Sequence, residues 1–513
     1  MDADIRNPSG RNLRLLVTLV SYGTGHLQYL KQIIETYKRM PLDVHVVVLS
    51  EAPKDLGPGV EVVVGLPSQD PWSLPFGHKR IFAENVERYD LFIYSEDDVL
   101  ATGKNILAFL RLTSVLGENE IAGFQLYETD SGGKVSLPGV HGPFHWKLDS
   151  VRQRGDQLVA EFTNQHSAFY MITQAQLKRA IASGGFICAP YKGRFDMLCA
   201  AGTNIYINCG FTKVMSLSAI EDFLLHHLPN RYVGRVGLSL DLFKTQIQTL
   251  IEVWNGSHPA STLCEIETKF TQRRWAKIYY KEPDREFLDM VPNDAKTILS
   301  VGCGWGAAEE KLKKKGARVT ALPLDSVIGA MAARYGIDMV YKNLHEGLNT
   351  LEGTEFDGVL ITDLLHLQPD PWVLLEKCAR LVAPGGALVI QSHNFSYLPV
   401  LLRRVLGFGE MRKLRSFSEG GVTALAMSAA KRQLKGMGFQ ISGERWFNRP
   451  HFNDAPPPNH FGIRKFLGRL MAEDWILQAR KCGARVRSRQ PETISNAPAE
   501  VEREQQVLTV EGH

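Results

Sequence analysis

The chain has 513 residues, of which 44% are hydrophobic and 22% are charged, and its net charge is +4. This length exceeds one ordinary hydrophobic core, so we expect two or three domains. The mild positive charge gives no indication of a nucleic-acid partner. The seven cysteines lack a Cys-x-x-Cys pair, so neither a disulfide framework nor a zinc site is indicated. A polar N-terminus and the lack of a long apolar run predict a cytoplasmic protein.

The first third of the chain reads as an open α/β sheet. Strands are expected over 13–19, 44–49 and 60–64, with a helix over 27–39. A further buried strand, 91–94, runs directly into three acids, Glu96, Asp97 and Asp98. Neighbouring carboxylates at a strand end repel one another unless a cation lies between them, and Mg²⁺ or Mn²⁺ is the natural occupant. A solvated acidic turn is the alternative.

Residues 13–235 resemble a GT-A-type glycosyltransferase, on the acidic motif that follows a hydrophobic strand. The resemblance implies a GT-A-like domain over residues 1–240 that takes a nucleotide-sugar donor and a glycan or glycolipid acceptor. Glu96 and Asp98, with Asp97 between them, would hold the metal on the donor diphosphate. Residues 218–228 predict a helix, on which Asp222 and His226 share a face. The resemblance makes Asp222 the base for the acceptor hydroxyl and His226 a metal ligand.

The middle of the chain predicts two helices, over 240–253 and 261–280, which we interpret as a helical linker at 241–275. Next comes a β-run from Thr297 that ends in Gly302, Gly304 and Gly306, followed by a helical pattern over 307–315. Strand, glycine-rich turn and helix form a nucleotide cradle, because glycines let the backbone approach a ligand at the helix N-terminus. Strands at 319–322, 338–341, 356–361 and 387–391 then alternate with helices, which predicts a parallel, doubly wound sheet.

Residues 275–448 resemble a class I S-adenosylmethionine-dependent methyltransferase, on the glycine motif, the run Phe356–Leu367 and the turn Pro384–Gly386, and we expect this domain over 276–450. The resemblance implies a Rossmann-like domain in which one group of residues contacts the cofactor. These are Gly302, Cys303, Gly304, Gly306, Asn343 and Asp363. His366 and His393 are the available bases for methyl transfer to a hydroxyl.

Two positions depart from that family's pattern. Where the family has an acid that helps to bind the methionine amine, this chain has Ser300. Where the family has an acid that binds the ribose hydroxyls, it has Pro323, with Asp325 as a substitute two residues later. Hydrogen bonds to charged groups are worth roughly 1.5–3 kcal/mol each, so losing both acids would weaken cofactor binding at least about 100-fold.

After residue 450 we expect a basic helical extension over 451–484 and a disordered tail over 485–513. The apolar points on a helix at 464–480 allow a peripheral membrane contact. Local basic clusters at Arg403–Arg404, Arg412–Lys413 and Arg415 could also meet a membrane or acidic sugars.

The sequence thus predicts two α/β domains: one transfers a sugar with Mn²⁺ or Mg²⁺, and the other methylates a glycan or a related small molecule with S-adenosylmethionine. Two alternatives stay open. The second domain could be a non-catalytic binding module of a glycosyltransferase, or the first could be a glycan-binding domain of a methyltransferase. The donor sugar, the acceptor and the oligomeric state are left open.

Overall fold

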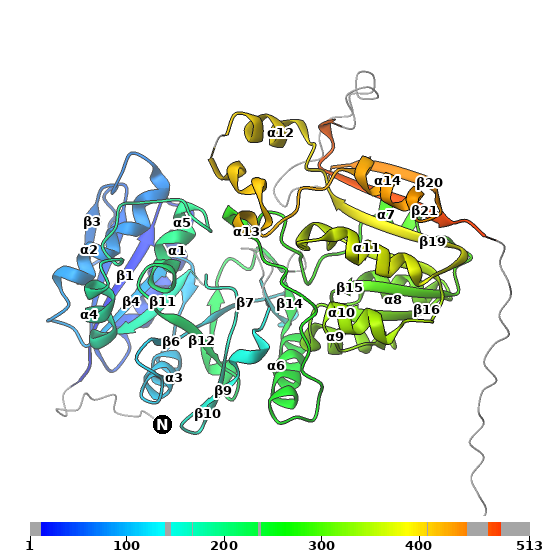
Figure 1. The fold of residues 1–513 in the computed structure, drawn as a ribbon. Helices are drawn as coiled ribbons and strands as arrows, with labels where there is room; N and C mark the ends of the chain where they lie inside the picture. The colour runs from blue at the N-terminus through cyan, green and yellow to red at the C-terminus, as the bar shows by residue number, and fades with distance from the viewer. Residues whose placement is uncertain are drawn as a thin grey trace, which may run out of the picture.

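The structure is a computed structural model that describes residues 12–138, 145–166, 168–233, 237–407, 409–448 and 470–483 (Figure 1). The predicted tail 485–513 and most of the predicted extension lie outside these residues. The two expected α/β architectures are both present, one in each half of the chain.

The first half is built on a five-stranded sheet of order β11-β4-β1-β2-β3, in which only β11 is antiparallel. Helices cover this sheet, which is why β1 and β4 are apolar along nearly their whole length. The strands are β1 (Arg14–Ser21), β2 (Asp43–Ser50), β3 (Val60–Val64), β4 (Leu91–Glu96) and β11 (Phe169–Thr173). The helices of this half are α1 (Leu27–Lys38), α2 (Gly77–Glu84), α3 (Gly103–Thr113), α4 (Gln174–Ala182) and α5 (Met197–Ile207), with a 3-10 turn, η1 (Pro71–Phe76).

Two smaller sheets extend the first half, with orders β6-β12-β10-β9 and β14-β8-β7-β13-β5. The first contains β6 (Glu120–Ala122), β9 (Arg152–Arg154), β10 (Gln157–Glu161) and β12 (Thr212–Ser216), and the second contains β5 (Val99–Leu100), β7 (Gln125–Thr129), β8 (Val135–Leu137), β13 (Leu224–His227) and β14 (Leu238–Ser239). A short turn, η2 (Leu148–Ser150), precedes β9.

The helix expected over 218–228 was wrong. This stretch forms a 3-10 turn, η3 (Ile220–Phe223), followed by strand β13. Pairing of β13 with β7 on one side and β5 on the other satisfies its backbone groups, and a short apolar run cannot reveal such pairing by its periodicity.

The linker begins as predicted with α6 (Leu240–Trp254), but the second helix, expected over 261–280, was also wrong. Residues 261–281, which we call the strap, have little regular secondary structure apart from one 3-10 turn, η4 (Thr271–Arg273). Some of its backbone groups bond within the strap, as Lys277 N does to Ile266 O, and others bond to the second domain: Leu263 N donates to Leu324 O, and Leu263 O accepts from Leu344 N.

The second half is built on a seven-stranded sheet of order β17-β16-β15-β18-β19-β21-β20. The first five of these strands are parallel, as predicted. The strands are β15 (Thr297–Cys303), β16 (Arg318–Pro323), β17 (Asp338–Met339), β18 (Phe356–Thr362), β19 (Val382–His393), β20 (Phe439–Phe447) and β21 (Asp474–Lys481). The surrounding helices are α7 (Arg285–Asp289), α8 (Ala307–Lys314), α9 (Ser326–Ala333), α10 (Leu344–Thr350), η5 (Leu365–Leu367), α11 (Pro371–Arg380), α12 (Leu398–Val405), η6 (Gly409–Arg415), α13 (Phe417–Gly420) and α14 (Met427–Gly436).

The helix expected over 464–480 was wrong in its described part, where Asp474–Lys481 form strand β21. It lies antiparallel between β19 and β20, with its residues Trp475–Leu477 fully buried. A strand covered on both faces is apolar without alternation, and such a run resembles a buried helix in sequence. Among the described residues, no helix combines the length and apolar character needed to span a membrane.

Candidate functional site

Two clusters of polar side chains lie at the carboxyl ends of the two main sheets. The first surrounds the predicted acidic motif. Asp97 and Asp98 follow β4, and His26 follows the neighbouring parallel strand β1, so both reach the same sheet edge. His26 Nδ1 lies 3.0 Å from Asp97 Oδ1 and 3.3 Å from Asp98 Oδ2.

His227 approaches Asp98 from the other side. Its Nε2 lies 3.3 Å from Asp98 Oδ2, and its Nδ1 lies 2.6 Å from the fully buried Glu128 Oε1. A carboxylate that holds one ring nitrogen and turns the other toward a second carboxylate is the arrangement found around metal-ligating histidines. Burial alone would lower the pKa of His227, but the two carboxylates outweigh it and raise that pKa.

The carboxylates themselves are short of partners. Burial, reinforced by Asp98 and Asp97, raises the pKa of Glu96 well above its usual value. Glu96 Oε1 and Asp98 Oδ1 are buried, and neither accepts a hydrogen bond from the described protein atoms. Three ligand atoms, from His26, Asp97 and Asp98, lie within 4.8 Å of one another. Two hard oxygens and an imidazole suit Mn²⁺ or Mg²⁺ chemically.

The structure moves two of the predicted residues away from this cluster. His226 points to the other side of β13, where it stacks on Tyr127 and its Nε2 lies 3.1 Å from Asn230 Oδ1. Asp222 forms an ion pair with Lys104 at 2.7 Å and shares no helix face with His226. Both corrections follow because the predicted helix is a turn followed by a strand. Side chains alternate between the two sides of a strand, so His227 faces Asp98 and His226 faces away from it. Sequence reasoning also missed His26, although it follows the strand that pairs with the acidic one.

The second cluster lies at the carboxyl edge of the seven-stranded sheet, around the glycine turn. Gly302 and Gly306 have φ angles of 85° and 93°, a region that side-chain-bearing residues avoid, so the turn depends on them. A Cβ at Gly304 would collide with the carbonyl oxygen of Tyr279. The Cys303 side chain is buried beside this turn, and burial raises the pKa of its thiol.

A carboxylate from another part of the chain lies beside position 300, where the family has an acid. Ser300 Oγ donates a 2.5 Å hydrogen bond to Glu309 Oε1, and Glu309 is buried at the start of α8. A carboxylate therefore lies beside the glycine turn although the strand itself carries none.

Asp325 and Asn343 both cap helices. Asp325 Oδ1 accepts from Ile328 N at 2.8 Å at the start of α9, and Asn343 Oδ1 accepts from Glu346 N at 3.0 Å at the start of α10. Asp325 is buried, which raises its pKa to about 6, whereas Asn343 is exposed.

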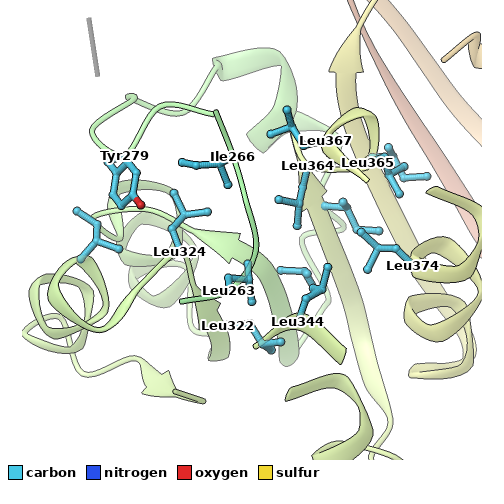
Figure 2. Packing of buried hydrophobic residues seen from close by; sticks show 14 of the residues in the cluster. Leu263, Ile266, Tyr279, Leu322, Leu324, Leu344, Leu364, Leu365, Leu367 and Leu374 are labelled. Atoms are coloured by element: carbon cyan, nitrogen blue, oxygen red, sulfur yellow. The ribbon is translucent and has the colours of Figure 1, made fainter. Parts of the chain in front are cut away.

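The strap covers the same edge. Tyr279 O accepts a 3.1 Å hydrogen bond from Trp305 N, in the glycine turn. The ammonium of Lys277, which is buried, donates to Thr362 O and Oγ1 at the end of β18. Figure 2 shows the apolar side of this contact, where Leu263, Ile266 and Tyr279 of the strap face leucines of the domain. Three positions expected to meet the cofactor (the glycine turn, Asp325 and the end of β18) are therefore in contact with the strap.

Beyond β18 and β19 lie the two histidines. Asp363, with a φ of 48°, follows β18 and lies 3.4 Å from Lys281 Nζ. His366 is fully buried, and its Nε2 lies 2.8 Å from Trp275 O. His393 keeps 15% of its side-chain surface exposed, and its Nδ1 lies 2.8 Å from Asp474 Oδ1. Asp474 escaped the sequence analysis because its segment was expected to be a helix outside the domain.

Comparison with known proteins matches the part of the chain that contains the second cluster. Residues 299–390 match the sequence profile of the family described as "Methyltransferase domain". The chain is 32% identical over 109 residues to a ubiquinone biosynthesis O-methyltransferase of Xylella fastidiosa, covering 20% of this chain and 44% of that protein. It is 28% identical over 154 residues to the enzyme of the same name from Psychrobacter arcticus, covering 28% of this chain and 59% of that protein. The chain thus spans about half the length of these relatives.

Solved methyltransferase structures are also similar to part of the chain. The N-methyltransferase NodS from Bradyrhizobium japonicum, in complex with S-adenosyl-L-homocysteine, covers 38% of this chain and 84% of its own, with 15% identity and a TM-score of 0.27. A methyltransferase from Mesorhizobium loti covers 38% and 96%, with 20% identity and a TM-score of 0.29. By the profile and the relatives, the second half of this chain contains a methyltransferase domain of the class I, S-adenosylmethionine-dependent type.

Proposed function

We propose that the second half transfers a methyl group from S-adenosylmethionine to a hydroxyl of a small molecule or glycan. The observation that carries this is the family match at 299–390, which includes the glycine turn. The relatives are named for O-methylation, which favours an oxygen acceptor. The residues also fit the cofactor: Glu309 supplies a carboxylate beside the turn, and Asp325 supplies one at the end of β16.

His393 is the base that we assign to this reaction. Bound S-adenosylmethionine would supply the methyl group to the acceptor oxygen, and His393 Nε2 would take the proton that the acceptor hydroxyl loses. Asp474 positions the ring, because its Oδ1 lies 2.8 Å from Nδ1 and attracts the positive charge that the ring gains, which leaves Nε2 as the proton acceptor. The buried His366 uses its Nε2 to donate to Trp275 O, which suits a structural role.

The test begins with calorimetric titration of the full chain with S-adenosylmethionine, followed by methyl transfer to a panel of hydroxyl-bearing acceptors. His393→Ala should lower kcat about 100-fold or more while cofactor affinity is kept, since general bases contribute 10²–10⁴-fold. Asp474→Asn should lower kcat less and should add nothing in the His393→Ala background. His345→Ala, at an exposed histidine on α10, is the matched control.

Absence of cofactor binding would retire methyl transfer and favour the non-catalytic binding module. Binding with turnover that His393→Ala leaves unchanged would retire the base alone.

A second function is favoured by the cluster around Asp98, which the methyltransferase domain does not use. We propose that the first half binds Mn²⁺ or Mg²⁺ through Asp97, Asp98, His26 and His227 and transfers a sugar from a nucleotide-sugar donor. Its support is the unpaired oxygens of Glu96 and Asp98 and the two histidines that converge on Asp98. The strand order, four parallel strands and one antiparallel edge strand, is compatible with the GT-A-like expectation.

Neighbouring histidines on β13 make a sharp test of this site. Mn²⁺ binding, followed by electron paramagnetic resonance of the free ion, should be lost in Asp98→Ala and weakened in His227→Ala. His226→Ala should keep it, because that ring lies on the other side of the strand. Sugar transfer or donor hydrolysis, measured with a panel of nucleotide sugars, should follow the same order. Equal losses for the two histidines would contradict the site, and Mn²⁺ binding without any donor turnover would leave a glycan-binding domain.

A further inference from the structure

Helix α12 carries a run of exposed apolar side chains that neither proposed activity uses. All residues from Leu401 to Leu406 are exposed. The exposed fractions of the apolar ones are 37% for Leu401, 52% for Leu402, 77% for Val405 and 62% for Leu406. Single exposed leucines are normal on proteins, but three apolar side chains on one short helix and a fourth at its C-cap mark an interaction surface.

These four side chains share one face of the helix. Their spacing of one, four and five residues keeps them on adjacent turns, while Val400, the buried residue of α12, lies on the opposite face. Below the helix, η6 is anchored by the buried Met411 and Leu414. The apolar face therefore points away from the domain, and Figure 1 shows α12 at its periphery.

The surroundings of this face are basic. Arg403 and Arg404 flank the apolar stripe on α12, and Arg412 and Arg415 are exposed on η6. None of the four forms an ion pair with a carboxylate in the described ranges. The nearby Glu410 already has partners, since it accepts from Thr271 N and from Lys413 Nζ. The arginines thus present uncompensated positive charge at the edges of an apolar face.

We propose that α12 and η6 bind the surface of an anionic lipid bilayer. Apolar side chains on one helix face enter the headgroup boundary, and long arginine side chains beside them reach the lipid phosphates. A second copy of the chain is disfavoured, because two copies of this face would bring the same arginines together, and four side chains cover far less than a stable interface.

The surface lies beside the methyltransferase site. Phe395, three residues before α12, has its ring centre 5.8 Å from that of His366 and 5.0 Å from that of Trp275 in the strap. A bilayer held by α12 would therefore lie near the edge that carries His393. The membrane contact expected for residues 464–480 is placed here on a different segment. Lipid binding does not rest on methyl transfer and can be measured without any substrate.

The experiment is co-sedimentation of the full chain with phosphatidylcholine vesicles that contain or lack phosphatidylserine. We expect binding at low ionic strength only to the anionic vesicles, weakening as salt rises. Arg403→Ala with Arg404→Ala should reduce it about 30-fold, at roughly fivefold for each basic residue. Leu402→Asp with Val405→Asp should abolish it, because charges then enter the apolar face.

Two control variants carry changes of the same kind elsewhere. Val64→Asp is made at an apolar residue 48% exposed on β3, and Lys314→Ala with Lys315→Ala removes an exposed basic pair near the end of α8. Both should bind like the wild type, and circular dichroism and the thermal midpoint check the folding of every variant. Wild-type protein that ignores phosphatidylserine, or α12 variants that still bind, would overturn the proposal. So would α12 variants that change only the oligomeric state in size-exclusion chromatography.

Discussion

The carboxylate of Asp325 has two roles that conflict. It caps α9 and is the group expected to meet the cofactor ribose, yet burial raises its pKa to about 6. A raised folded-state pKa means that the native state favours the protonated acid. The associated stability is present below the unfolded pKa of about 4 and is lost as the pH rises through about 6.

Asp325→Asn should therefore stabilise the protein at neutral pH. Asparagine caps helices as well as aspartate does and carries no charge to bury. The shift of about two pKa units corresponds to ~2–3 kcal/mol. Urea unfolding should show this gain at pH 7 and little difference near pH 4. Asp338→Asn, at an exposed aspartate paired with Arg318, should show no comparable gain, and an equal gain in both would contradict the burial argument.

For single residues, the sequence indicated those that directly follow a strand. It missed those whose position depends on how strands pair. The glycine turn and Asp97–Asp98 were found because their positions follow from the chain order. His227 was passed over for His226, since the choice between them depends on whether the segment is a helix or a strand. Asp474 and Glu309 reach their partners only through tertiary packing, and no local pattern shows that.

The strap is the element that best shows what sequence reasoning cannot supply. Its apolar residues are spaced closely enough to resemble a helix, but several of its backbone bonds go to Leu324, Leu344 and Trp305 of the methyltransferase domain. Similarly, β21 completes a sheet whose other strands end before residue 448. By contrast, the parallel strands from β15 to β19 were predictable, because each is followed by its own helix and turn signals.

Lys277 gives the strap a measurable effect on the cofactor. Its ammonium is bonded at Thr362, at the edge where the positively charged cofactor is expected, and burial lowers its pKa to about 8. Lys277→Met keeps the stem and removes the charge, so affinity for S-adenosylmethionine should rise about tenfold. Titration calorimetry measures this, with Lys269→Met, at an exposed lysine of the strap bonded to Ser418 O, as control. Weaker binding in Lys277→Met would show that the lysine helps to hold the cofactor.

Across the whole molecule, one hydrophobic cluster joins the two halves. It contains Trp146 and Phe162 of the first half, Phe243 and Ile247 of α6, and Leu299 of the methyltransferase sheet. Trp146 packs on Phe243 and donates to Gln246 Oε1 at 3.1 Å. In Figure 1, α6 stands between the two halves. The segment interpreted from sequence as a linker is therefore a packed part of the structure. Truncating the chain there should lower the free energy of unfolding.

A chain that begins at Leu240 keeps α6 and the strap, whereas one that begins at Arg285 loses both. The shorter chain exposes the partners of Leu263, Ile266 and Tyr279, and leaves Leu324 O and Trp305 N without their strap bonds. Burying each large apolar side chain is worth about 1.5–3 kcal/mol, so the loss approaches the 5–15 kcal/mol that stabilises a whole domain. We expect the longer chain to unfold cooperatively on heating and the shorter one to show no thermal transition. Equal thermal midpoints would instead mean that the strap only connects the halves, and that the site at the sheet edge forms without it.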